Sequence, residues 1–436
     1  MERYNEYKDS GVQWLGEIPS HWDMLALKHI LKLRKKLVGK QSYKYELLSL
    51  TLQGIIKRDI DNPTGKFPSS FDTYQEVNAG DFVFCNFDNE ETPRAVGLSE
   101  YKGMITGAYD VLSCKNSNLT NRYLIYYFLY IDDAKRFKPL YKGLRKTVPF
   151  DSFMSYKIPV PSIEEQQAIA FYLDTATAKI DEAIAQQQKM IGLLNERKQI
   201  IINNAVTKGL NPDAPMKDSG VDWIGEIPEH WEINKFRNLF KTRTGITFTK
   251  AQLEEEGEPV ISYGQIHSKE NWGASVNPVL IRHIPASLTK GKESALAFKG
   301  DFLFADTSED FEGCGNCVCI DTPEPIYAGY HTILAKRDND EHEQYLAYLF
   351  ASSNWRGQLR SMVNGVKVYS VTQSLLKAVI VLLPPKSEQI EIAEYITKRV
   401  VLIDAAIKRH TDRIKLLQER KQIIINDVVT GKVKVS

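Results

Sequence analysis

The stretch that decides the fold is KDSGVQWLGEIPSHW, Lys8 to Trp22, because the chain repeats it as KDSGVDWIGEIPEHW, Lys217 to Trp231, with 12 of 15 positions identical. A second pair follows in the same order: LLNERKQIIINNAVT, Leu193 to Thr207, returns as LLQERKQIIINDVVT, Leu416 to Thr430, again with 12 of 15 identical. The offset grows from 209 to 223, so the second copy carries about 14 extra residues. A period this long indicates a duplicated pair of domains, not a solenoid of short repeats.

Each copy ends in a segment with the pattern of a long amphipathic helix. From Ser162 to Thr207 there is no proline, and apolar residues recur at spacings of three, four and seven. Ser162 followed by Glu165 is typical of a capping box, and we take Ser387, after a Pro-Pro pair, as its counterpart in the second copy. Such rods cannot bury their apolar stripes alone, so we expect them to pair as an antiparallel intramolecular coiled coil. The stripe residues are Leu173, Ile180, Ile184, Ile191 and Leu194, then Ile396, Ile403, Ile407, Ile414 and Leu417.

Gln187 and His410 interrupt the two stripes at equivalent positions near the helix midpoints. We hypothesise that they meet at a pseudo-twofold axis as a polar layer that fixes the register of the coiled coil. The alternative, that both side chains face solvent, stays open.

The bodies between motif and helix, near residues 23–160 and 232–383, mix short β-rich runs with turns. The runs predict a mixed α/β domain, present twice. We expect domain limits of 1–160, 161–210, 211–383 and 384–436. Predicted helices are 121–137 and 341–359, and predicted strands are 45–55, 81–87, 109–114, 155–161, 259–266, 301–307, 316–320, 331–336 and 378–384.

The composition narrows the class of protein. With 56 Lys plus Arg against 55 Asp plus Glu, the formal net charge is +1, which argues against one bulk-basic DNA-binding module and against an acidic disordered chain. Five cysteines, an odd number, do not form the disulfide framework of a secreted protein. The first ten residues are too charged for a signal peptide, and the longest apolar runs are far shorter than the ~18 residues of a membrane span. We expect a cytoplasmic protein without a membrane partner.

Motifs for catalysis are missing from the sequence. There is no G-x-x-x-x-G-K-[ST] phosphate loop, no G-x-G-x-x-G before a helix and no Asp/Asn-Pro-Pro-Tyr/Phe tetrapeptide for methyl transfer. Cys314, Cys317 and Cys319, with His331 downstream, resemble part of a zinc site, but their spacing and the lack of an equivalent in the first copy favour buried thiols that pack as small hydrophobes. We therefore predict no metal and no catalytic residue in this chain.

Basic residues gather at two places in each body, early and late, with aromatic residues and glycines among them. This pattern suits contacts to phosphates beside base edges, although solvated surface charge is the alternative for any single residue. The early clusters are Lys28, Lys32, Arg34, Lys35, Lys36 and Lys40, and Lys235, Arg237, Lys241, Arg243 and Lys250. The late ones are Lys135, Arg136, Lys138, Lys142, Arg145 and Lys146, and Arg356, Arg360 and Lys367.

The duplicated S-G-V-x-W-x-G-E-I-P-x-H-W, the G-D-F-[VL]-F of each body and the IPVPSIEEQ and LLPPKSEQ segments resemble the specificity subunit of type I restriction-modification systems over nearly the whole chain. The resemblance implies two target recognition domains that each read half of a split double-stranded DNA site. It implies helical regions that act as a ruler and dock two methyltransferase subunits, which two restriction subunits join. S-adenosylmethionine, ATP and magnesium would then be bound by those partners, and none of them by this chain.

The resemblance also assigns residues to both surfaces. The DNA-reading loops would present Gln53, Lys57, Asn86, Lys142, Arg145 and Lys146 in the first half, and Gln265, His267, Asp306, Thr307, Lys367 and Tyr369 in the second. The early basic cluster and its aromatic neighbours add Lys40 and Tyr43 as DNA contacts. Lys290 and Lys292 would be added by an insertion near residues 273–294. Subunit docking would use Trp14, Trp22, Trp223 and Trp231 together with the stripe residues and Gln187 and His410. Two alternatives are an orphan DNA-binding scaffold without catalytic partners and a self-sufficient methyltransferase, which lacks its motif.

Overall fold

The computed structural model describes residues 2–60, 68, 70–221, 224–363, 365 and 368–435. The chain forms two compact units. Unit 1 consists of Met1–Gln188 with Thr411–Ser436, and unit 2 consists of Lys189–His410. The division falls inside the two long helices, so each unit combines one body with a part of each helix.

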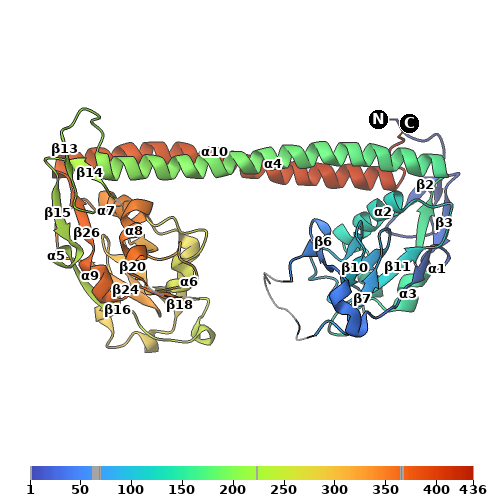
Figure 1. The fold of residues 1–436 in the computed structure, drawn as a ribbon, viewed down its shortest axis with the longest axis horizontal. Coiled ribbons are helices and arrows are strands. Elements are labelled where there is room, and N and C mark those ends of the chain that lie inside the picture. The colour runs from blue at the N-terminus through green and yellow to red at the C-terminus, as the bar shows by residue number, and fades with distance from the viewer. Residues whose placement is uncertain are drawn as a thin grey trace. The chain divides into compact units, whose positions relative to one another are not determined.

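Both long helices form where the sequence predicts them. They are α4, Ile163–Lys208, and α10, Lys386–Val429 (Figure 1). The capping box of α4 is confirmed, because the Glu165 N–H donates to Ser162 Oγ and the Ser162 N–H donates to Glu165 Oε2, both at 3.3 Å. The counterpart predicted at Ser387 is wrong. Pro385 holds the cap position of α10, where only its carbonyl is needed, and Ser387 lies inside the first turn.

Within each unit the parts of α4 and α10 run antiparallel. In unit 1, Leu173 of α4 shares a core with Val428 of α10, and further along α4 the Asp181 carboxylate pairs with Lys421, earlier in α10, at 2.6 Å. In unit 2 the Lys198 ammonium pairs with Asp404 at 2.9 Å. These two ion pairs are equivalent positions of the repeat. The polar layer of Gln187 and His410 stays a prediction, since these residues belong to different units.

The body of unit 1 contains two four-stranded sheets and two strand pairs. One sheet, in the order β4-β11-β8-β9, is antiparallel, whereas in the sheet β6-β5-β10-β7 strand β10 runs parallel to β5. The pairs are β1 with β2 and β3 with β12. Bounds are β1 Tyr7–Asp9, β2 Glu17–Pro19, β3 Asp23–Ala26, α1 Leu27–Ile30, β4 Leu31–Leu33, η1 Gly39–Lys44, β5 Leu47–Thr51, β6 Gly54–Arg58, β7 Gln75–Val77, β8 Phe82–Phe84, β9 Val96–Leu98, β10 Gly103–Ile105, β11 Asp110–Cys114, α2 Asn121–Asp133, η2 Lys138–Leu140, α3 Phe150–Ser155 and β12 Lys157–Val160.

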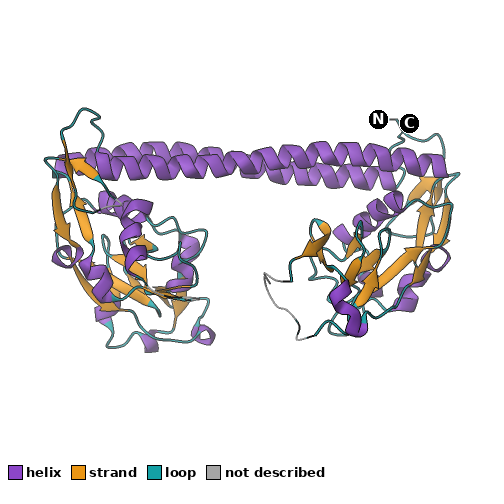
Figure 2. Ribbon diagram, viewed as in Figure 1, coloured by secondary structure: helices purple, strands orange, loops and turns teal. Residues whose placement is uncertain are grey.

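The body of unit 2 repeats these two sheets and two pairs and adds a third pair, β21 with β25. Its sheets are β16-β24-β20-β22 and β18-β17-β23-β19, with β23 parallel to β17, and its pairs are β13 with β14 and β15 with β26. Bounds are β13 Met216–Asp218, β14 Glu226–Pro228, β15 Glu232–Lys235, α5 Phe236–Leu239, β16 Phe240–Thr244, η3 Lys250–Gln252, β17 Glu258–Ile261, α6 Tyr263–Ile266, η4 Pro278–Leu280, β18 Arg282–Ile284, η5 Ala286–Leu288, η6 Glu293–Ala295, β19 Leu296–Ala297, β20 Phe302–Ala305, β21 Thr307–Ser308, β22 Cys317–Cys319, β23 Ile326–Ala328, β24 Thr332–Arg337, α7 Glu343–Ala351, α8 Ser353–Met362, β25 Tyr369–Ser370, α9 Gln373–Ala378 and β26 Ile380–Leu383. Figure 2 shows strands mixed with short helices in each body, so the predicted mixed α/β class is confirmed.

The helix predicted at 121–137 ends early, at Asp133, and three other predicted elements differ in kind from the structure. The single strand at 45–55 is the hairpin of β5 and β6, closed by a turn in which Gly54 has a φ of +101°. The strand at 259–266 ends at Ile261, since Ser262 and Gln265 form a capping box that starts α6. The helix at 341–359 is two helices, because the backbone of Ser352 is extended and its hydroxyl accepts from the N–H of Trp355 as the cap of α8.

The largest difference between the bodies lies between the first two strands of the mixed sheet. In unit 1 a two-residue turn joins β5 to β6, whereas residues 262–281, with α6 and η4, join β17 to β18 in unit 2. The insertion expected near 273–294 therefore begins earlier, at Ser262.

Along the described residues, no helix combines the length and apolar character needed to cross a lipid bilayer.

The repeated G-D-F-x-F motif is explained by one turn. Gly80 and Gly300 both have a φ of +89°, a left-handed conformation that favours glycine. The following aspartate closes the turn, because Asp81 Oδ2 accepts from the N–H of Asn78 at 2.8 Å and Asp301 Oδ2 from that of Phe298 at 2.9 Å. The next residues form the central strands β8 and β20, whose side chains are buried.

Candidate nucleic-acid interface

Two loops predicted to face DNA lie together in each unit. In unit 1 the loop after β8 meets the segment before α3, because the Val148 N–H donates to the Asn86 carbonyl and the Asp88 N–H donates to the Arg145 carbonyl, both at 2.7 Å. In unit 2 the Val371 N–H donates to the Asp306 carbonyl at 2.8 Å. The same backbone link therefore brings the same two loops together twice, with different side chains on them.

The unit 1 loops form a tip in which charges of both signs alternate. Residues 142–147 make a tight hairpin, with Lys142 bridged to Thr147 and Leu144 fully exposed at its end. The Arg145 guanidinium donates to the Asp88 carboxylate and lies 4.8 Å from the Phe87 ring centroid. Three predicted DNA-contacting cations, Lys142, Arg145 and Lys146, thus share the tip with neighbouring acids.

These acids hold the basic side chains in place. Hydrogen bonds from Arg145 lower the pKa of Asp88, and those from Lys146 and Lys138 lower the pKa of Glu90. Lys146 also lies 3.4 Å from a carboxylate oxygen of Glu91. The sequence prediction missed Asp88, Glu90 and Glu91, although they follow β8 directly and the run of acids was a visible signal.

The other predicted residues of unit 1 lie on separate elements. Lys40 and Tyr43 are on η1, both exposed. Gln53 lies in the turn between β5 and β6, and Lys57 of β6 has its ammonium 3.7 Å from Glu46 and 5.4 Å from the Tyr101 ring centroid. Asn86 is buried, with its amide donating to Asp110 at 2.7 Å, so its side chain positions the loop.

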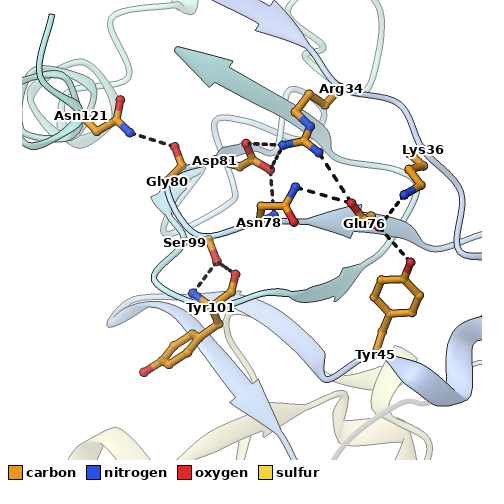
Figure 3. A network of polar contacts seen from close by, with 10 residues as sticks. All are labelled: Arg34, Lys36, Tyr45, Glu76, Asn78, Gly80, Asp81, Ser99, Tyr101 and Asn121. Atoms are coloured by element: carbon orange, nitrogen blue, oxygen red, sulfur yellow. Dashed lines mark hydrogen bonds and ion pairs between the residues drawn. The ribbon is translucent and has the colours of Figure 1, made fainter. Parts of the chain in front are cut away.

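Part of the early basic cluster has a structural role, as Figure 3 shows. The Arg34 guanidinium reaches the buried carboxylates of Glu76 and Asp81, at 3.6 and 3.4 Å. The Lys36 ammonium and the Tyr45 hydroxyl donate to Glu76 at 2.9 and 2.8 Å. The hydrogen bond from Lys36 is the main cause that lowers the pKa of Glu76, although burial opposes it. Arg34 and Lys36 therefore neutralise acids that the fold has buried.

In unit 2 the structure brings four predicted residues together. His267 of the insertion hydrogen-bonds the Thr307 carbonyl at 2.8 Å, and the Thr307 hydroxyl donates to Asp306 at 2.7 Å. Strand β21 pairs Ser308 with Tyr369 of β25. His331, which the sequence suggests only as a metal ligand, joins this cluster through a 3.2 Å contact of its Nδ1 with Asp306. Thus the insertion contributes directly to the second loop cluster.

The remaining predicted residues of unit 2 have other surroundings. Gln265 accepts from the Ser262 N–H at 3.1 Å as part of the cap of α6. Lys290 and Lys292 are exposed around η5 and η6. Lys367 and Trp223 lie outside the described residues.

Comparison with known proteins gives the family. The family model of the type I restriction modification DNA specificity domain matches residues 98–191 and 228–416. This chain belongs to that family. It is 27% identical over 97% of its length to a protein of Methanocaldococcus jannaschii assigned as the type I restriction enzyme MjaX specificity subunit, of which 96% is covered. It is 25% identical to the MjaVIII specificity subunit of the same organism, over 77% of this chain and 75% of that protein.

The fold of this chain is also found among solved structures. One chain from a structure of a type I R-M system has a TM-score of 0.64 at 13% identity, with 95% of this chain and 99% of that chain covered. The match covers nearly the whole of both chains, so this solved chain shares the overall fold.

In this specificity subunit the repeated motif joins each body to the long helices. The Trp22 indole N–H donates to Glu165 in the first turn of α4 at 3.4 Å, and His21 lies 3.0 Å from the same carboxylate. In unit 2, Trp231 and His230 make the same contacts to Glu388 of α10, at 3.2 and 2.8 Å. Trp22 and Trp231 are buried. Their side chains are therefore occupied within their own unit, and their role in docking a partner stays a prediction.

Most of the predicted docking stripe is also turned inward. Leu173, Ile180, Ile396 and Ile403 are buried, and the rest of the stripe is partly buried. Trp14 stacks on Tyr156 with ring centroids 5.5 Å apart. The stripe thus holds the helix pair together and leaves little surface for a partner.

A different repeated set of apolar residues faces outward. Leu193 and Ile200 of α4 are each 50% exposed, and the equivalent Leu416 and Ile423 of α10 are 64% and 57% exposed. All four lie in the repeated LLxERKQIIIN segment, seven residues apart in each helix, so each pair covers one helix face. Large exposed apolar side chains at matching positions are typical of a protein-binding surface.

The cysteines of unit 2 pack as apolar side chains, as predicted. Cys314, Cys317 and Cys319 are buried, and burial raises the pKa of the Cys317 thiol to about 12. Strand register places Cys317 and Cys319 where unit 1 has Val96 and Leu98. The residues that the structure describes contain no cluster of three or more potential metal ligands.

Proposed function

We propose that this chain recognises a bipartite DNA target, with one body reading each half-site. The observation that carries the proposal is the duplicated loop pair, linked by Val148 to Asn86 in unit 1 and by Val371 to Asp306 in unit 2. The same backbone arrangement with different side chains would allow a protein to present two different sets of DNA-contacting residues in the same orientation. Arg, Lys, His, Thr and Tyr side chains on these loops are suited to base edges and phosphates.

We further propose that two methyltransferase subunits dock on the outward apolar pairs, Leu193 with Ile200 and Leu416 with Ile423. Identical partners require equivalent surfaces, and these pairs occupy equivalent positions of the repeat. Two restriction subunits would then join through the methyltransferases. In this proposal S-adenosylmethionine, ATP and magnesium belong to the partners, and this chain supplies recognition without catalysis.

Adenine methylation in a reconstituted system tests the proposal. The purified chain should methylate target DNA only when the separate methyltransferase subunit is added. Leu193→Asp and Leu416→Asp should each reduce binding of that subunit, whereas Phe171→Asp, which changes a still more exposed apolar residue outside the repeated segment, should not. Methylation by the chain alone would contradict the proposal, and DNA binding without any response to the methyltransferase would favour an orphan scaffold.

Arg145→Ala tests the readout of one half-site, once methylated adenines mapped across a genome have given the target. If Arg145 contacts a base, the variant should lose about 5- to 150-fold discrimination at one half-site and none at the other. If it contacts only phosphate, discrimination should be kept and the slope of log affinity against log salt should fall by about 0.9.

Asp88→Asn is the matched variant. It removes the acid that holds Arg145 but keeps a residue that tolerates the φ of +47° at this position. Its DNA affinity should rise and its salt dependence should steepen. Unchanged DNA binding in both variants would show that the hairpin of residues 142–147 does not contact DNA.

A further inference from the structure

Unit 2 contains a polar cavity that the proposed function does not use. Its volume is about 250 Å³, and it lies between α4 and the body. This volume is below the ~300–1,000 Å³ of pockets for drug-sized ligands, so a small group fits it best. The polar lining consists of Asn195, Lys198 and Gln199 of α4 with Asn271, Asn316 and Arg356 of the body.

The charge at this cavity is not balanced by the surrounding protein. Arg356 donates to the Asn316 side chain, and its Nε is buried without a hydrogen-bond partner among the described residues. The nearby Arg360 has its own carboxylate, Glu312, at 3.0 Å, but none lies within 4.0 Å of the Arg356 guanidinium in the described chain. Burial, together with the charge of Arg360, lowers the pKa of Arg356. A partly buried cation without a counter-ion is unfavourable, so an anion in the cavity would stabilise the charged form of Arg356.

Two further side chains favour a polar occupant. The Lys198 ammonium lies over the Trp272 ring, 4.8 Å from its centroid, while pairing with Asp404. Gln199 Oε1 is buried and has no partner among the described residues. We propose that this cavity binds a small oxyanion of the phosphate class, with Arg356 as its main contact. The proposal goes beyond the recognition of DNA and can hold without it.

Unit 1 fills the corresponding place with its own carboxylate. Strand register makes Ala95, before β9, the counterpart of Asn316, before β22. The Ala95 N–H donates to the buried Asp132 at 2.8 Å, and Asp132 pairs with Lys135 at 2.6 Å. Where unit 1 has an internal anion beside this strand, unit 2 has Arg356 and a cavity. The site is therefore expected in one unit only.

The cavity connects to the second loop cluster through a chain of hydrogen bonds. Because Arg356 donates to Asn316 Oδ1, the Asn316 amide donates to His267 Nδ1 at 3.1 Å. The His267 Nε2–H must then donate to the Thr307 carbonyl at 2.8 Å. An oxyanion on Arg356 would thus act on the loop proposed to read the second half-site.

Thermal unfolding of the full chain in increasing inorganic phosphate, against chloride at equal ionic strength, tests the site. Phosphate should raise the Tm of the wild-type chain, and Arg356→Gln should weaken the apparent affinity by about ten- to hundredfold, as expected for a lost charge-assisted contact. Arg409→Gln, which removes an exposed guanidinium from α10, is the matched control and should keep the wild-type response.

Gln199→Glu keeps the proposal testable if Arg356→Gln fails to fold. It places a carboxylate in the cavity, so it should raise the Tm without phosphate and remove the phosphate response. The same variants titrated with DNA in phosphate-free buffer separate two sources of the ligand. A salt slope reduced by about 0.9 identifies a DNA phosphate, and unchanged DNA binding identifies a free anion. Equal phosphate and DNA responses in wild type and all three variants would overturn the site.

Discussion

Gln166 is the residue whose replacement tests the attachment of body 1 to the long helix. Its side chain is fully buried, accepts from the Thr120 N–H and donates to the Asn118 and Pro161 carbonyls, each at 2.9 Å. Gln166→Met keeps the length of the side chain but removes all three hydrogen bonds to the backbone. At about 1 kcal/mol for each hydrogen bond, unit 1 should lose about 3 kcal/mol of stability.

Calorimetry with hydrogen exchange can measure this loss in the intact chain. For a unit of roughly 200 residues, 3 kcal/mol corresponds to a Tm lower by about 6–12 °C. Exchange should accelerate in α2 and the start of α4, with unit 2 unchanged. The control is Gln186→Met, an exposed glutamine of the same helix. If Gln166→Met unfolds at the temperature of the control, the three bonds do not carry the attachment and the reasoning is refuted.

Two further predictions concern the junction of motif and helices. Burial raises the pKa of Glu165, but hydrogen bonds from His21 and Trp22 outweigh it, so the folded pKa lies below the ordinary value of 4.5. The stability this group adds is present above pH 4.5 and lost as pH falls through the folded value, and Glu165→Gln should reduce that part of the acid sensitivity in urea unfolding. A parallel decline in both proteins would contradict this assignment. Gly431→Ala should lower the stability more than Gly11→Ala. Both glycines have φ near +70°, which costs an alanine about 1 kcal/mol, but only at Gly431 would the new Cβ lie 2.4 Å from Pro19. Equal losses in the two variants would show that the contact with Pro19 relaxes.

The long-range architecture could be predicted because the sequence carries it twice. The repeated segments, the spacing of apolar residues and the Ser162 capping box give both long helices and their pairing. The local sequence pattern failed to predict element boundaries where a residue type is common in two kinds of structure. Ser352 continues the helical pattern in sequence but caps a second helix, and Leu52 and Gln53 continue a β-rich run but form a turn.

The docking surface could not be predicted from periodicity alone. Leu193 and Ile200 of the repeated LLxERKQIIIN segment recur at helical spacing, and so do Ile191 and Leu194 of the predicted stripe. Only the partner helix decides which stripe is buried, and it leaves Leu193 and Ile200 half-exposed. Charge pairing could not be predicted either, because the partners are distant in sequence. Arg145 pairs with Asp88, 57 residues away, and Arg34 pairs with Asp81, 47 residues away. A net charge of +1 therefore conceals cations that are already paired inside the fold.

The junction between the repeated motif and the long helices also explains why some residues are the same in both copies and others differ. In unit 1 the motif touches the start of α4 through Trp22 and Glu165, and it packs against Gly431, just beyond the end of α10. In unit 2, Trp231 touches Glu388 at the start of α10 and packs against Gly209, just beyond the end of α4. Each such residue is constrained by two helices at once, so a change in one contact disturbs the other. The loops after β8 and β20 share one equivalent backbone link, Val148 to Asn86 and Val371 to Asp306, and this link places no demand on the identity of the side chains beside it.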